Sequence, residues 1–317
     1  MNIAETAKWL KERDNFLVIT HRRPDGDTLG SAAALTDTLR ELGKTAYILF
    51  NPETTARYLQ FVENFWAPEG FVPSEIISVD IAAPDLFPEN SKTLFESVTL
   101  CIDHHPSNTN FCSRNLIDSS RAACGEIIYD LSIALTGHIS AESATCLYVA
   151  LSTDTGCFSF ANVTANTFYV TSKLIDAGAQ YSRINRQLFR EKAKVRIMLE
   201  GLIFSGLQFF CSDTVCISTI TNDMMRQAGV TDDDMDEIAS IPGSVAPVIV
   251  GITIRELSSP EDCKISVRSS RAFNSNDFCA FFGGGGHPMA AGFSMNKTVS
   301  EIRDLIVAAI PDFLPKL

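Results

Sequence analysis

Three side chains that could bind a metal ion lie close together near the N-terminus. His21, Asp25 and Asp27 follow the apolar run 16–19, and a helix-like run begins at Thr28. An imidazole with two carboxylates suits a borderline or hard divalent ion such as Mn²⁺ better than Ca²⁺ or a thiolate-bound metal. The same pattern is also typical of a polar turn between a strand and a helix, in which an aspartate caps the helix. This stretch alone leaves both interpretations open.

Three further segments carry carboxylates or imidazoles where a regular element ends. They are Asp80 after the run 76–79, Asp103, His104 and His105 after the run 98–102, and Asp154 after the run 141–152. Each aspartate could simply cap a helix or close a turn. However, the carboxyl ends of parallel strands share one edge of a sheet, where ligands bind. We therefore expect five aspartates and three histidines to meet in one cleft.

So many carboxylates cannot remain ionised side by side without counter-charge, because like charges raise each other's pKa. A pair of divalent cations would resolve this conflict. Two ions about 3.5–4 Å apart activate water and clamp phosphoryl oxygens in an in-line displacement. The sequence therefore predicts a two-metal centre that acts on phosphoryl groups.

The elements that must position these residues alternate along the first two thirds of the chain. We expect a helix within 1–15 and strands at 16–20, 44–50, 76–80 and 98–102, with helices at 28–42, 54–65, 122–135, 141–152, 164–177 and 181–190. Alternating strands and helices predict an α/β fold with a doubly wound, mainly parallel sheet. We assign residues 1–190 to this metal-binding domain.

The last third of the chain has a different pattern. A charged helix is expected over 191–205 as a connection, followed by a smaller α+β domain at 206–317 across a cleft. Its expected elements are a hairpin over 207–220, strands at 248–254, 263–268 and 293–295, and a final helix at 299–313. The acidic run 232–234 suits a helix start, and we assign it no function.

Composition limits the classes of function. The chain has 317 residues, which suggests about two domains, and its net charge of −12 argues against tight binding of long nucleic acid. No apolar run approaches the ~18–20 residues that span a bilayer, and the start resembles no signal peptide. We expect a cytoplasmic protein without membrane association. The nine cysteines form no C-x-x-C pair, so we expect neither a zinc cluster nor a disulfide framework.

A glycine run in the second domain could bind an anion. Gly283, Gly284, Gly285 and Gly286 precede His287, and backbone N–H groups of glycine can approach a phosphate closely. The nearby Arg268 and Arg271 strengthen the anion interpretation. A hinge or tight turn would explain the glycines equally well, and Arg268 could be an exposed edge-strand arginine.

The full set of motifs resembles a known family. His21-x-x-x-Asp25-x-Asp27, Asp80, Asp103-His104-His105 and Asp154 resemble the four motifs of the DHH phosphoesterase superfamily, and Gly283–His287 with Ala290-Ala291-Gly292-Phe293 resembles the signature of the DHH-associated C-terminal domain. The resemblance spans nearly the whole chain. Length and layout are most similar to the branch of stand-alone bacterial oligoribonucleases (nanoRNases) and pAp phosphatases.

The resemblance implies roles for individual residues. His21 and Asp25 would hold one metal ion, Asp27, His104 and Asp154 the other, and Asp80 would bridge them. Asp103 would orient His104 through its ring N–H, while His105 would face the scissile phosphate as an electrophile or general acid. Substrate would be held by Arg268, Arg271, Gly284, Gly285, Gly286 and His287. The ions would be Mn²⁺, with Mg²⁺ or Co²⁺ as substitutes, and a homodimer is also implied.

The leading functional hypothesis is hydrolysis of short oligoribonucleotides to mononucleotides and dephosphorylation of 3′-phosphoadenosine 5′-phosphate (pAp). A cyclic or linear dinucleotide phosphodiesterase, a single-strand exonuclease and an inorganic pyrophosphatase are alternatives. A strand exonuclease should need a basic, aromatic-lined channel, of which the sequence shows little sign. A nucleotide-binding regulator without catalysis is the alternative from another class, and it would have no need of a water-activating pair of metals.

Overall fold

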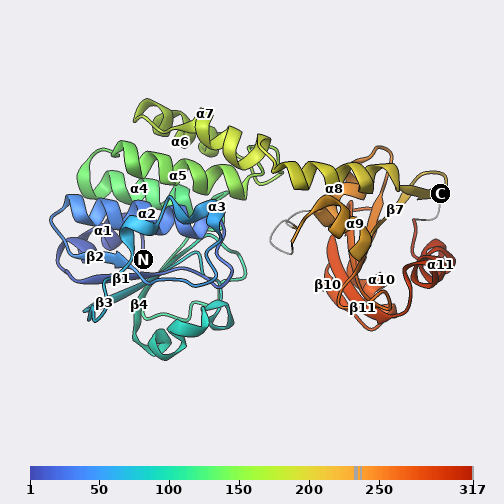
Figure 1. Cartoon of the computed structure of the whole chain (residues 1–317). Helices are drawn as coiled ribbons and strands as arrows, with labels where there is room; N and C mark the ends of the chain where they lie inside the picture. The colour runs from blue at the N-terminus through green and yellow to red at the C-terminus, as the bar shows by residue number, and fades with distance from the viewer. Residues whose placement is uncertain (232–234, 236–237, 316–317) are drawn as a thin grey trace. The chain divides into compact units, whose positions relative to one another are not determined.

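A computed structural model describes residues 1–231, 235 and 238–315 of the chain. The chain divides into two compact units, Met1–Glu191 and Lys192–Leu317 (Figure 1). The acidic run 232–234, for which we expected a helix start, lies outside the described residues. Within the described part, no helix is both long and apolar enough to cross a lipid bilayer.

A five-stranded parallel sheet organises the first unit. Its strands are β1 (Phe16–Ile19), β2 (Ala46–Ile48), β3 (Glu75–Val79), β4 (Val98–Asp103) and β5 (Asn115–Ile117). All pairings are parallel, in the order β2-β1-β3-β4-β5. This arrangement confirms the predicted α/β class with a parallel sheet. The strand order reverses between β1 and β3, and ligands bind at the carboxyl ends of strands beside such a point.

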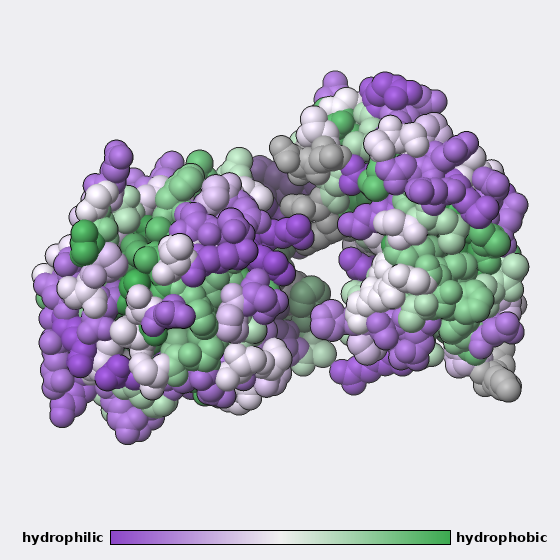
Figure 2. Space-filling view, turned by 90° about the horizontal axis from the view of Figure 1, so that it is seen from below, coloured by the Kyte–Doolittle hydropathy of each residue, from purple (hydrophilic) through white to green (hydrophobic). Residues whose placement is uncertain are grey.

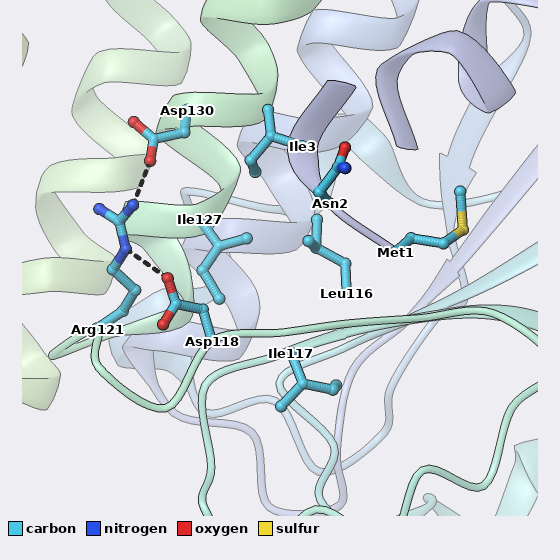
Figure 3. A pocket seen from close by; sticks show the side chains of 9 residues that line it. All are labelled: Met1, Asn2, Ile3, Leu116, Ile117, Asp118, Arg121, Ile127 and Asp130. Carbon is cyan, nitrogen blue, oxygen red and sulfur yellow. Dashed lines mark hydrogen bonds and ion pairs between the residues drawn. The ribbon is translucent and has the colours of Figure 1, made fainter. Parts of the chain in front are cut away.

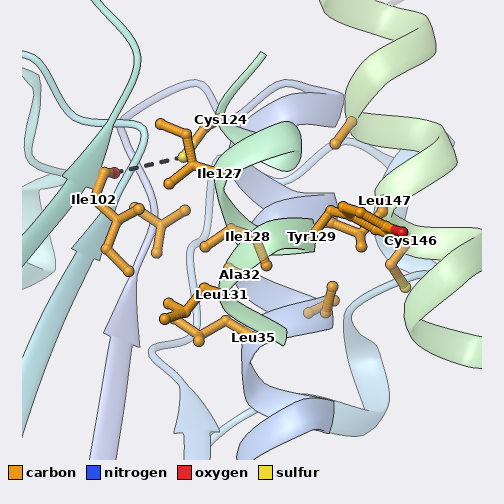
Figure 4. Close-up of a cluster of buried hydrophobic side chains, with 14 of the residues drawn as sticks. Ala32, Leu35, Ile102, Cys124, Ile127, Ile128, Tyr129, Leu131, Cys146 and Leu147 are labelled. Carbon is orange, nitrogen blue, oxygen red and sulfur yellow. Dashed lines mark hydrogen bonds between the residues drawn. The ribbon is translucent and has the colours of Figure 1, made fainter. Parts of the chain in front are cut away.

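Helices cover one face of this sheet (Figure 1). They are α1 (Ile3–Lys11), α2 (Gly26–Glu41) and α4 (Cys124–Thr136); α5 (Ala141–Asp154) packs on α2 and α4, and α6 (Ala165–Asp176) packs on α5. Their apolar side chains meet those of β4 in the main core (Figure 4). The backbones of α2 and α5 lie close together at Gly30. A Cβ atom at this position would be only 2.3 Å from the carbonyl oxygen of Cys146.

The other face of the sheet is covered by shorter segments. They are the 3-10 turns η2 (Pro84–Leu86) and η3 (Glu89–Ser97). Phe87, Phe95 and Phe111 form an aromatic cluster there, with centroids 5.5–5.8 Å apart. The short helix α3 (Ala56–Leu59) and the 3-10 turn η1 (Glu63–Phe65) belong with the helical face, since Phe61, Val62 and Phe65 join the main core. The helix expected over 54–65 is reduced to α3 and η1, because i→i+3 hydrogen bonds replace α-helical ones beyond Leu59. The unit ends in α7 (Tyr181–Asn185) and a π-helical turn (Arg186–Arg190).

The second unit is built on a mixed six-stranded sheet in the order β10-β11-β9-β8-β7-β6. Its strands are β6 (Gln208–Phe210), β7 (Val215–Ile220), β8 (Val250–Glu256), β9 (Asp262–Ser269), β10 (Gly285–His287) and β11 (Ala290–Asn296), and its helices are α8 (Lys194–Ser205), α9 (Asn222–Ala228), α10 (Ser275–Phe281) and α11 (Val299–Ala309). Among the described strands of this second unit, only β7 and β8 pair in parallel. Figure 2 shows hydrophilic and hydrophobic patches mixed on the displayed face of each unit.

Candidate metal centre

The loops after β1, β3 and β4 and the end of α5 bring carboxylates and imidazoles together. Within each of three groups, one ligand atom per residue lies within 4.8 Å of the others. The groups are His21, Asp25 and Asp80; Asp27, His104 and Asp154; and Asp80, His104 and His105. All six residues that the sequence predicted as metal ligands are thus neighbours in space.

Asp80 lies between the two sides of this cluster. Its Oδ2 atom is 3.8 Å from Nε2 of His21, and its Oδ1 atom is 3.5 Å from Nε2 of His104. Asp80 has a φ of +61° and is only 3% exposed, and its N–H donates to the carbonyl of Ile102. A left-handed conformation at a residue other than glycine costs about 1–3 kcal/mol and is concentrated at functional sites. The strained backbone directs the carboxylate to both sides.

His21 and Asp25 form one side. Nε2 of His21 is 3.5 Å from Oδ1 of Asp25, and Nδ1 of His21 is 2.7 Å from the carbonyl oxygen of Arg22. Asp25 is also the N-cap of α2, because its Oδ1 accepts from the N–H groups of Asp27 and Thr28. The capping and ligand interpretations of this aspartate are therefore compatible. The backbone contact at Nδ1 leaves Nε2 directed at the carboxylates.

Asp27, His104 and Asp154 form the other side. Nε2 of His104 is 3.7 Å from Oδ2 of Asp27 and 3.6 Å from Oδ2 of Asp154. The buried Asp27 carboxylate also accepts from the N–H groups of Cys124 and Gly125, which begin α4, and from the Ser31 hydroxyl; these distances are 2.6, 3.0 and 2.9 Å. The positive end of the α4 dipole therefore faces this carboxylate.

The two adjacent histidines are held by different partners, and this corrects one expectation. Asp103 was expected to orient His104, but its Oδ1 atom lies 2.7 Å from Nδ1 of His105. Nδ1 of His104 instead lies 3.1 Å from the carbonyl oxygen of Arg121. Asn108 donates to the other Asp103 oxygen at 2.6 Å. Asp103 therefore orients His105, because consecutive side chains leave the chain in different directions.

Burial makes the cluster electrostatically unfavourable without counter-charge. It raises the pKa of Asp80 well above its ordinary value, and the carboxylates of Asp27 and Asp25 add to the effect. Burial also raises the pKa of Asp27, together with the charge of Asp154. Among the described residues, Oδ1 of Asp80 has no hydrogen-bond partner. A buried orphan oxygen between two imidazoles, amid repelling carboxylates, fits a site for divalent cations.

The carbonyl that holds His104 belongs to an ion-paired turn. The Arg121 guanidinium contacts Asp118 at 2.9 Å and Asp130 at 2.7 Å, beside a hollow of about 240 Å³ lined also by the N-terminal residues (Figure 3). Sequence reasoning missed Arg121 and Asn108. Arg121 acts through its backbone and so leaves no side-chain signal, whereas Asn108, five residues after Asp103, was a polar residue that could have been considered.

The residues expected to hold substrate lie in the second unit. Gly285–His287 form strand β10 rather than a loop, and they pair with β11. The N–H groups of Gly283, Gly284 and Gly286 already donate to Ala280 O, Cys279 O and Asn276 Oδ1. These three donors are therefore unavailable for the anion nest that we expected. Glycine serves close packing instead, since a Cβ on Gly284 would lie 2.2 Å from the carbonyl oxygen of Gly292.

Arg268, Arg271 and His287, which we also expected to bind substrate, lie on or near strand β10. Arg268 is on β9, directly opposite Ala290 of β11, and its Nη1 donates to the carbonyl of Val267. His287 is exposed at the end of β10, and Arg271 is exposed in the turn after β9. Their exposure is compatible with a ligand at this edge of the sheet.

Comparison with known proteins gives matches along most of the chain. Residues 15–151 match the N-terminal domain of the DHH family, and residues 212–314 match the DHHA1 domain. A Thermus thermophilus protein named bifunctional oligoribonuclease and PAP phosphatase NrnA is 30% identical over 88% of this chain and 83% of its own length. A Bacillus subtilis protein of the same name is 26% identical over 89% of this chain and 90% of its own length.

Solved structures share the fold. An exopolyphosphatase-related protein from Bacteroides fragilis superimposes with a TM-score of 0.85 at 24% identity, covering 98% of this chain and 95% of that one. The exonuclease RecJ bound to manganese superimposes with a TM-score of 0.57 at 14% identity, covering 99% of this chain and 95% of that one. These likenesses establish the architecture.

Proposed function

Because the chain belongs to the DHH family and is a hydrolase of phosphoester bonds, we propose that it degrades short oligoribonucleotides to mononucleotides and dephosphorylates pAp. The observation that carries this proposal is the position of Asp80, whose two oxygens face the imidazoles of His21 and His104. A regulator that only bound nucleotides would have no need of such a strained, buried carboxylate between two ligand groups. The names of the similar Thermus and Bacillus proteins support the choice of substrates.

In this proposal one Mn²⁺ ion would be held by His21, Asp25 and Asp80, and the other by Asp27, Asp80, His104 and Asp154. Such a pair would supply an activated water and positive charge for the phosphoryl oxygens. The protein contributes a rigid frame: the start of α2 fixes Asp25 and Asp27, the start of α4 holds Asp27, and the Arg121 carbonyl sets the orientation of His104.

His105 is the proposed general acid. The hydrogen bond to Asp103 raises the pKa of His105 above its ordinary value, although burial opposes the shift. A larger protonated fraction near neutral pH suits a group that donates a proton to the leaving oxygen. The side chain of His105 is 41% exposed, so an oxygen atom of the substrate can reach the imidazole ring.

Residues of the second unit would bind a remote part of the substrate. Arg268, Arg271 and His287 are the candidates, with the Gly284–Gly286 segment as a tightly packed support rather than a donor surface. The net charge of −12 agrees with a short ligand rather than a long strand.

A substrate and metal panel tests the proposal. Release of mononucleotide from a diadenylate would be measured with Mn²⁺ and with Mg²⁺, beside pAp, a cyclic dinucleotide, pyrophosphate and a series of longer strands. We expect the diadenylate and pAp to be the best substrates, with Mn²⁺ as the better ion. Preference for the cyclic dinucleotide, for long strands or for pyrophosphate would support the respective alternative instead.

The role of Asp80 needs a variant with a matched control. Asp80→Ala should lower the rate by more than the ~10–100-fold that loss of an outer-shell partner costs. Asp176→Ala, at an exposed aspartate of the same unit, should leave the rate unchanged. If Asp80→Ala retained the rate within a few-fold, the bridging role would be wrong.

A further inference from the structure

The turn after Asp154 has an unusual backbone. Gly156, Cys157 and Phe158 have φ values of +54°, +54° and +65°, so three successive residues are left-handed. Side-chain-bearing residues rarely adopt this conformation unless their surroundings enforce it, and such strain is concentrated at functional sites. Backbone hydrogen bonds enforce it here: the N–H of Cys157 donates to Ser152 O at 2.7 Å and that of Phe160 to Thr155 O at 3.0 Å.

The turn holds the ring of Phe160 at the surface. Phe160 is 59% exposed, although aromatic side chains normally gain free energy by burial. Its ring lies against the backbone of Gly156, because a Cβ atom there would be 2.3 Å from the ring. Phe158, by contrast, packs against Tyr148 and Phe168 with centroids 5.8 and 5.9 Å away. Internal packing therefore explains the position of Phe158 but not the exposure of Phe160.

The turn that carries Phe160 is also fixed relative to the candidate metal centre. Asn162, two residues after Phe160, donates from Nδ2 to the carbonyl oxygens of Asp154 and Ala122, each at 3.1 Å. The carboxylate of Asp154 lies 3.6 Å from His104, and Ala122 closely precedes α4. A single amide thus fastens the turn to two segments that build the centre.

We propose that Phe160 is a substrate-binding residue whose ring stacks on a nucleobase next to the scissile phosphate. This inference rests on the proposed hydrolysis of short nucleotides and adds a base-binding position within the first unit. Every nucleobase has a π-face, so an aromatic platform accepts all bases without reading sequence. A platform beside the centre would favour nucleotides over phosphate esters that lack a base.

The test compares base-bearing and abasic substrates. Phe160→Ala and Phe160→Trp would be assayed on a diadenylate and on two analogues in which one or the other adenine is replaced by hydrogen. Removal of a stacking ring should raise KM for the diadenylate by about 5- to 150-fold. On the analogue that lacks the stacked base, wild type and Phe160→Ala should have the same KM. Phe160→Trp should keep a KM near that of the wild type.

A control separates this effect from general surface changes. Phe204→Ala alters a phenylalanine of α8 that is 50% exposed, and it should leave KM unchanged on all three substrates. Melting temperatures would verify that each variant is folded. Equal losses of Phe160→Ala on base-bearing and abasic substrates, or no loss on either, would overturn the stacking role while leaving the proposed hydrolysis intact. A wild type inactive on the diadenylate and pAp would overturn both.

Discussion

The contact between Asp103 and His105 gives a prediction that separates general-acid catalysis from metal binding. Asp103→Asn keeps the size of the side chain but removes its charge. Hydrogen bonds to charged groups contribute about 1.5–3 kcal/mol, and the 41% exposure of the His105 side chain reduces this by solvent screening to about 1 kcal/mol. Since the hydrogen bond to Asp103 raises the pKa of His105, this pKa should fall when the charge of Asp103 is removed.

Leaving-group dependence provides the assay. A ribose hydroxyl is a poor leaving group and needs a proton, whereas p-nitrophenolate leaves readily without one. If His105 is the acid, Asp103→Asn should lower turnover of a diadenylate by about 5-fold, the factor that corresponds to about 1 kcal/mol, and should leave turnover of a p-nitrophenyl phosphodiester nearly unchanged. The high-pH limb of the diadenylate profile should also move toward lower pH, because less His105 remains protonated.

Two results would refute this reasoning. Equal losses on both substrates would mean that Asp103 supports the centre rather than the leaving group. An unchanged pH profile would mean that the protonation of His105 does not limit the rate. Asn108→Ala is a useful comparison, since it removes the other side-chain partner of Asp103 without removing its charge.

Three further predictions concern stability. Burial raises the pKa of Asp80 and Asp27, so in the metal-free protein their contribution to the free energy of unfolding is fully present at low pH and is lost as pH rises through the folded-state pKa values. Chelation should therefore lower the melting temperature more at pH 8 than at pH 5.5. Equal losses at both pH values would contradict this. Gly30→Ala should cost about 1–3 kcal/mol of unfolding free energy through overpacking against Cys146, whereas Gly201→Ala, in open space on α8, should be neutral or stabilising by up to about 1 kcal/mol in urea melts. Burial tends to raise the pKa of Glu200, but the hydrogen bonds from Lys192 and Arg196 outweigh this effect and lower the pKa. These hydrogen bonds therefore stabilise the fold above about pH 4.3, and this stabilisation is lost as pH falls further. In calorimetry, Glu200→Gln should lose less stability between pH 5 and 3 than the wild type, and an equal loss would mean that the ion pairs of Glu200 do not stabilise the fold.

Much of the centre could be anticipated because parallel strands end at the same edge of a sheet. Two residues illustrate this: His21 follows β1 and Asp80 follows β3, and β1 and β3 are hydrogen-bonded neighbours. Sequence order along an α/β unit thus translates into adjacency in space. The short strand β5 was not anticipated, because three residues flanked by polar positions give no clear alternation.

Features that depend on local direction could not be anticipated. Sequence does not indicate which of two adjacent histidines faces Asp103, because this depends on the loop conformation after β4. The glycine run was likewise ambiguous. Three of its N–H groups donate to oxygen atoms of α10, including the side chain of Asn276, and the segment also pairs with β11. These hydrogen bonds depend on how the chain folds back from α10 onto β11, which the sequence does not indicate. The position of Phe160 depends on three left-handed residues, of which only Gly156 is a residue type that favours this conformation.

The contact of Asp27 with the start of α4 makes the centre observable without turnover. The amide protons of Cys124 and Gly125 point at a carboxylate that is a candidate ligand, so a cation on that carboxylate would change their magnetic environment. Their two resonances in a nitrogen-15 correlation spectrum would act as built-in probes of occupancy. Titration of a diamagnetic ion such as Mg²⁺ could then be followed at two buried positions, which measures ion affinity separately from catalysis.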